Sequence, residues 1–125
     1  MMKSSLKRRP TVLVVEDEGV VRLDAAATLR DAGFKVLEAA NAEQALSVVA
    51  RGAPVDVLFT DINMPGRMDG LELARRINRL RPGVHLLLTS GKARPAGGQI
   101  PHAGAFIPKP YSPDAMTRAV SRMLA

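Results

Sequence analysis

The chain has 125 residues, 46% hydrophobic residues and a formal net charge of +6, which fits one globular domain with a core of its own. It has no cysteine, which excludes disulfides and thiolate zinc sites. No apolar run approaches the roughly 20 residues of a membrane helix, and the basic start lacks the apolar core of a signal peptide. We therefore expect a cytoplasmic protein.

The first ten residues predict a flexible basic leader that Pro10 ends, and residues 11–125 predict the folded domain. The strand at 11–16 is apolar on both faces, as a central parallel strand is. A helix is predicted over 19–32 and ends at Gly33. Its expected apolar positions are Val20, Leu23, Ala27 and Leu29.

A short, half-polar strand at 35–38 predicts a sheet edge. Asn41 then begins a helix, with Gln44 in the capping-box position. The apolar run 55–60 is the next strand, and a helix follows from about Asp69. Its apolar positions, at helical spacing, are Leu73, Ile77 and Leu80.

The strand at 84–88 is followed by residues 91–104, where several Gly and Pro predict a short or irregular fourth helix. A strand at 105–107 and a helix capped by Ser112, with Pro113 in its first turn, complete the chain. This alternation predicts an α/β fold with a doubly wound, five-stranded parallel sheet. The expected strand order is 2-1-3-4-5, in a flavodoxin-like (βα)5 arrangement.

Polar residues end four of the five strands: Glu16 with Asp17, then Asp61, Thr89 and Lys109. The carboxyl ends of parallel strands share one edge of the sheet, where open α/β folds place their ligands. Three crowded carboxylates favour a hard divalent cation, and Mg²⁺ prefers such oxygen ligands. The hydroxyl and the ammonium group suit the oxygens of a phosphoryl group.

These residues lie in motifs that resemble the receiver domains of bacterial two-component response regulators, from about Thr11 to the end of the chain. Each motif is weak alone, but five in the same order are a strong signal. The motifs are Val-Val-Glu-Asp-Glu (14–18), Thr-Asp-Ile-Asn-Met-Pro (60–65), Met-Asp-Gly (68–70), Leu-Leu-Thr-Ser-Gly (87–91) and Phe-Ile-Pro-Lys-Pro-Tyr (106–111).

The resemblance implies that Asp61 accepts a phosphoryl group from a histidine of a sensor histidine kinase or a histidine phosphotransfer protein. It implies Mg²⁺ as cofactor, held by Asp17, Asp61 and the backbone carbonyl of Asn63, with Glu16 acting through water. Lys109 would pair with a phosphoryl oxygen across a cis bond to Pro110. Thr89 would move toward the phosphate, and Phe106 would follow.

Two departures from the usual receiver pattern stand out. The segment Met-Pro-Gly-Arg-Met-Asp-Gly (64–70) is one residue longer than the common form, and residues 91–104 replace a firm fourth helix. Both departures look like those of a subgroup of short receivers, found alone or at the ends of hybrid kinases.

The leading interpretation is a stand-alone receiver, not an enzyme acting on other substrates, that signals to an unknown downstream protein. The first alternative is a receiver fragment of a hybrid histidine kinase. A different class is a module that binds nucleic acid or another anionic surface through the leader and the arginines at 75, 76, 79 and 81, although little aromatic surface for base stacking makes it the weaker reading. A small Mg²⁺ phosphatase is a further alternative, but no substrate-sized insertion supports it.

Overall fold

The computed structural model describes residues 9–92, 94–101 and 104–125. Along the chain, the elements are β1 (Thr11–Val15), α2 (Gly19–Asp31), β2 (Lys35–Ala39), α3 (Ala42–Ala50), β3 (Val57–Asp61), α4 (Gly70–Leu80), β4 (His85–Ser90), β5 (Ala105–Pro108) and α5 (Pro113–Leu124). Residues 1–8 of the predicted leader lie outside the described part.

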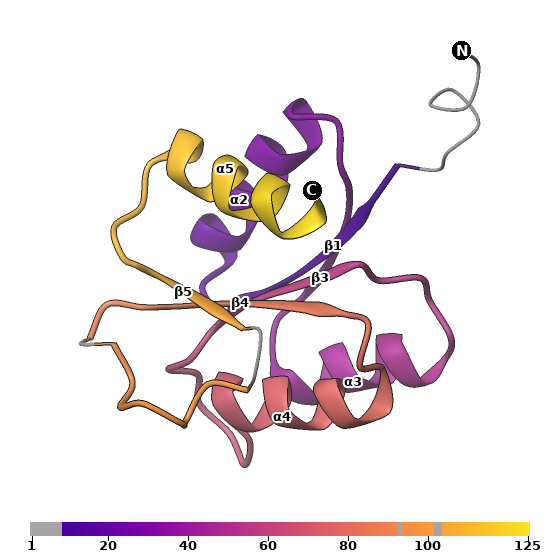
Figure 1. Ribbon diagram of the computed structural model, residues 1–125, viewed down its shortest axis with the longest axis vertical. Helices are drawn as coiled ribbons and strands as arrows, with labels where there is room; N and C mark the ends of the chain where they lie inside the picture. The colour runs from indigo at the N-terminus through magenta and orange to yellow at the C-terminus, as the bar shows by residue number, and fades with distance from the viewer. Residues whose placement is uncertain (1–8, 93, 102–103) are drawn as a thin grey trace.

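The five strands form one parallel sheet in the order β2-β1-β3-β4-β5, which confirms the predicted topology. Helices α2 and α5 cover one face of the sheet, and α3 and α4 cover the other (Figure 1). Each face has its own core of buried aliphatic side chains. β1, β3 and β4 lie inside the sheet, and nearly all of their residues are buried, whereas the edge strand β2 is mostly half-buried.

The predicted helix starts are confirmed in detail. The Asn41 side chain accepts a hydrogen bond from the Gln44 N–H at 2.8 Å, and the Gln44 side chain accepts one from the Ala40 N–H. Ser112 caps α5 by accepting from the Ala115 N–H at 3.0 Å. These local bonds satisfy backbone donors that a helix start leaves free.

The predicted buried face of α2 is wrong. Leu29 is buried as predicted, but Val20 and Leu23 are 82% and 58% exposed and Ala27 is exposed as well. Ala25 and Ala26 are buried in their place. The helix packs its small alanines against the sheet, so a prediction from hydropathy alone chose the wrong face of the helix. In α4, Leu73 and Ile77 are fully buried as predicted, but Leu80 in the last turn is 60% exposed.

The C-terminal end of α4 is hydrogen-bonded to the end of α3 and the loop after it. The guanidinium group of Arg81 donates to the carbonyl oxygens of Ala53 at 2.8 Å and Val49 at 2.6 Å. Arg81 therefore stabilises the fold by joining the end of α4 to the end of α3.

The connection from β4 to β5 contains no helix in its described residues, 91–92, 94–101 and 104. This agrees with the short or irregular fourth helix that its Gly and Pro residues predict. Among the residues that the structure describes, no helix is long and apolar enough to cross a membrane.

Candidate functional site

The sheet topology brings the predicted residues to one edge. Asp61 ends β3 and lies opposite Thr89 of β4 in the strand register. Glu16 and Asp17 directly follow the adjacent strand β1. The site is therefore fixed by strands buried on both faces.

Three carboxylates meet at this edge. One oxygen from each of Glu16, Asp17 and Asp61 lies within 4.8 Å of the other two. Glu16 and Asp61 are only 4% and 6% exposed, whereas Asp17 faces solvent. Burial raises the pKa of Glu16, and a hydrogen bond from Lys109 offsets this only in part. The cluster thus holds more negative charge than its protein neighbours neutralise.

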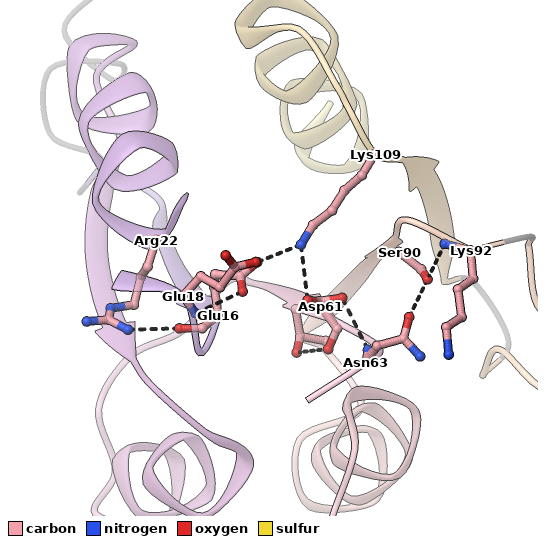
Figure 2. A network of polar contacts seen from close by, with 9 residues as sticks. Glu16, Glu18, Arg22, Asp61, Asn63, Ser90, Lys92 and Lys109 are labelled. Carbon is pink, nitrogen blue, oxygen red and sulfur yellow. Dashed lines mark hydrogen bonds and ion pairs between the residues drawn. The ribbon is translucent and has the colours of Figure 1, made fainter. Parts of the chain in front are cut away.

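Lys109 joins two of these carboxylates. Its Nζ lies 2.8 Å from Glu16 Oε1 and 3.0 Å from Asp61 Oδ2 (Figure 2). Burial lowers the pKa of the ammonium group, but the hydrogen bonds to both carboxylates outweigh it, so the pKa lies above its usual value. Lys109 is therefore a fixed cation. The Lys109–Pro110 bond is cis, as predicted.

Thr89 is 3% exposed beside Asp61. Its Oγ1 is the buried side-chain polar atom that lacks a hydrogen-bond partner among the described residues. Such an atom is costly and calls for an explanation. Phe106, one strand further, is half-buried, and the Arg94 guanidinium carbon lies 5.6 Å from its ring centroid.

No role was predicted for the side chains of Asn63 and Ser90, which lie bonded to each other in the structure. The Asn63 N–H donates to Asp61 Oδ1 at 3.1 Å, and the Ser90 hydroxyl donates to the Asn63 side-chain oxygen. Both residues lie within the quoted motifs, but only the folded sheet edge shows that their side chains meet.

Gly70 explains why the Met-Asp-Gly motif ends in glycine. A Cβ atom at this position would overlap the backbone carbonyl oxygen of Asp61. The Gly70 N–H also donates to the carbonyl of Ile62 at 3.0 Å. The first turn of α4 therefore packs directly against the end of β3, and the longer loop of residues 62–69 leaves this contact intact.

A surface hollow of about 670 Å³ adjoins the carboxylates. Lys109 lines it together with Tyr111, Pro110 and Gly91, and the exposed Val20 belongs to its α2 side. Sequence reasoning missed this hollow because it placed Val20 in the core.

The donor set fits Mg²⁺. It offers hard oxygen ligands from two strand ends, one of them on the exposed Asp17, which leaves room for coordinated water. A divalent cation would also neutralise the charge that Lys109 leaves uncompensated.

The protein is therefore of the doubly wound α/β class, with an acidic, lysine-bearing site at the carboxyl ends of its strands. Such a site suits a divalent cation and a phosphoryl group. The family model for the response regulator receiver domain matches residues 12–121. The chain belongs to this family and is a receiver domain of two-component systems.

Two signalling proteins are similar to the chain in sequence. The chain is 35% identical over 125 residues to the sensor kinase CckA of Brucella abortus, a match covering 97% of this chain and 13% of that protein. It is 33% identical to the phosphate regulon transcriptional regulatory protein PhoB of Pseudomonas aeruginosa, covering 91% of this chain and 51% of that protein. The chain thus spans at most about half of these relatives.

Solved structures match over most of their length. A response regulator receiver protein from Sinorhizobium medicae WSM419 gives a TM-score of 0.87 at 30% identity, covering 94% of this chain and 95% of that chain. The receiver domain of the hybrid histidine kinase CckA gives 0.80 at 32% identity, covering 92% and 99%. The fold shared with these receivers is the one described above.

Proposed function

We propose that this receiver takes a phosphoryl group from a phosphohistidine onto Asp61 in a Mg²⁺-dependent reaction and signals by the resulting change in shape. One observation carries the proposal. Asp61 is buried at the carboxyl end of β3, and its Oδ2 lies 3.0 Å from the Nζ of the charged Lys109. Phosphoryl transfer needs mainly positioning and charge stabilisation, which this arrangement supplies.

In the proposed reaction, a carboxylate oxygen of Asp61 attacks the phosphorus of the donor. The new P–O bond forms as the donor's P–N bond breaks, and the departing imidazole takes up a proton. Lys109 stays charged and binds a phosphoryl oxygen. The buried hydroxyl of Thr89, which has no partner in the described structure, gains one in the phosphoryl group.

We propose that Asp17, Asp61 and the backbone carbonyl of Asn63 bind Mg²⁺ directly and that Glu16 binds it through water. When bound, the cation neutralises charge that develops on the transferred phosphoryl group. The exposure of Asp17 and the burial of Glu16 support this division of roles.

The decisive experiment is labelling with acetyl phosphate and Mg²⁺, followed by intact mass. The native chain gains one acid-labile phosphoryl group, and Asp61→Asn gains none. Asp31→Asn, which neutralises an exposed carboxylate at the end of α2, is the matched control and labels normally. Undiminished labelling of Asp61→Asn would refute the proposal.

The cation is tested separately by Mg²⁺ titration. Asp17→Ala weakens binding strongly and Glu16→Ala weakens it less, because only Asp17 is proposed to contact the ion directly. Equal affinity of native chain and Asp17→Ala would show that the cation is placed wrongly.

We propose that the hollow beside Lys109 receives the histidine-bearing donor protein. Continuity with the site supports this, since Lys109 belongs to both, and Val20 offers an exposed apolar contact. Val20→Glu then slows transfer from a phosphorylated histidine kinase or histidine phosphotransfer protein but not labelling by acetyl phosphate. Leu80→Glu, at the similarly exposed Leu80, is the control. Equal slowing by both variants would contradict this surface.

Because kinases phosphorylate such donors with ATP, we place the reaction in the cytoplasm.

Nucleic-acid binding gains no support from the arginines of α4. Arg75, Arg76 and Arg79 all lie near Glu72, and Arg81 is bonded to backbone carbonyls. The proposed chemistry is the same in a stand-alone receiver and in a hybrid kinase.

A further inference from the structure

Ser90 is buried beside the site, with 2% of its surface exposed, at the end of β4. Its Oγ accepts a hydrogen bond from the Lys92 N–H at 3.0 Å. This leaves the hydroxyl proton for a second bond, which Ser90 donates to the side-chain oxygen of Asn63. The single proton of this hydroxyl is therefore bonded to the side-chain oxygen of Asn63.

Asn63 is bound at two points. Its backbone N–H donates to Asp61 Oδ1 at 3.1 Å, and its side chain is turned toward Ser90, not toward Lys109 (Figure 2). Asn63 itself is exposed. An unbranched polar side chain on the surface normally samples several rotamers, so the bond to the buried Ser90 selects one of them.

The rotamer of Asn63 bears on the chemistry because of in-line displacement. The donor nitrogen leaves phosphorus on the side opposite the Asp61 oxygen, and a hydrolysing water later attacks from that same side. Asn63 is exposed, and its backbone N–H is bonded to Asp61 Oδ1, so its side chain begins within a few bonds of this carboxylate. An amide that swings into the approach line obstructs both reactions.

We propose that Ser90 is a positioning residue that holds the Asn63 amide aside and keeps the approach to Asp61 open. The inference rests on the proposed phosphorylation of Asp61 and deepens it. One hydroxyl then sets the speed at which the phosphoryl group enters and the speed at which water removes it. Its bond from the Lys92 N–H places this control at the first residues of the segment 91–104.

The test is Ser90→Ala, which removes the hydroxyl and adds no bulk. Labelling by acetyl phosphate and hydrolysis of the purified phosphoprotein both slow, each by about three- to tenfold, as the loss of one net hydrogen bond allows. Mg²⁺ affinity stays unchanged, because the backbone of Asn63 is retained.

A double-mutant cycle separates positioning from general damage. Asn63→Ala removes the amide, and adding Ser90→Ala to it has no further effect on either rate. Ser112→Ala, which removes the cap of α5 far along the chain, lowers stability without changing either rate. Ser90→Gly, which also removes the hydroxyl, tests the inference if Ser90→Ala fails to fold.

Several results overturn the inference. These are native rates in Ser90→Ala, opposite changes in the two rates, a full Ser90→Ala effect in the Asn63→Ala background, or a loss of Mg²⁺ affinity that accounts for the slowing. Failure of the proposed function is distinct, since native protein would then take no label at Asp61.

Discussion

Two crossover connections lead into and out of β4, and they solve the same topological task differently. Parallel neighbours need a connection of about a dozen residues or more, usually a helix. Between β3 and β4 this connection contains α4, whereas between β4 and β5 the described residues contain no helix. Figure 1 shows α4 packed under the sheet and the second connection looping away from its edge.

The sequence accounts for the difference. Asp69 caps α4 by accepting from the Glu72 N–H at 2.9 Å, and Leu73, Ala74 and Ile77 are fully buried. In residues 91–104, Ile100 packs against the core, among glycines and prolines that disfavour a helix. The first connection buries apolar surface to offset its ordering entropy, and the second buries little.

The contrast separates two tasks. The connection through α4 packs against the backbone of Asp61, which phosphoryl transfer needs in a fixed place. The second connection, whose described residues contain no helix, begins two residues after Thr89 and is suited to report the state of the site. We therefore expect the signal to be read at residues 91–104, by ordering or re-docking of this segment.

Amide exchange gives the largest contrast. Local opening free energies range from about zero to the full 5–15 kcal/mol of a domain. We expect amides of residues 94–101 to exchange at least about a thousandfold faster than buried amides of α5 and α4, and phosphorylation to change exchange in this segment most. Protection equal to that of α5, or no response to phosphorylation, would contradict the proposed readout.

Truncation of one apolar side chain in each connection comes next. Leu73→Ala removes a fully buried side chain and costs about 3 kcal/mol of unfolding free energy. Ile100 is only half-buried, so Ile100→Ala costs about 1 kcal/mol. Urea unfolding of both variants measures the difference. Equal losses would mean that the second connection is as well packed as the first.

Glycine substitution costs less stability than Leu73→Ala and links stability to function. Gly70→Ala forces a Cβ atom onto the Asp61 carbonyl, costs about 2 kcal/mol and slows labelling of Asp61. Gly97 has no positive φ and nothing within 4 Å of a built Cβ. Gly97→Ala therefore leaves stability within about 0.5 kcal/mol of native, or slightly above it. Labelling and melting temperature are measured on both. Normal labelling of Gly70→Ala would show that the contact does not position Asp61.

Several features followed from the sequence alone. They are the order of strands, the helix caps at Asn41 and Ser112, and the meeting of Glu16, Asp61 and Lys109 at one edge of the sheet. Strand ends carry this information well, because parallel topology determines which ends are neighbours. The irregular connection was equally readable, since Gly and Pro act locally.

The missed features depend on packing. α2 has valine, leucine and alanine on several faces, and the sheet accepted the face with Ala25 and Ala26. Hydrophobicity did not distinguish that face from the one with Val20. The bond between Ser90 and Asn63 joins residues 27 positions apart, through rotamers that no local pattern encodes.

Arg81 bonds Val49 at the end of α3 and Ala53 just after it, and Gly70 packs on Asp61, so α4 is held at both of its ends. A helix held at both ends has little freedom to slide or rotate. Residues 91–104 are held less firmly, with Ile100 packed against the core and Gln99 bonded to Arg75 at 3.3 Å. We therefore expect the displacement caused by a new phosphoryl group to appear mainly in residues 91–104, and we expect Arg81→Ala to let α4 move as well.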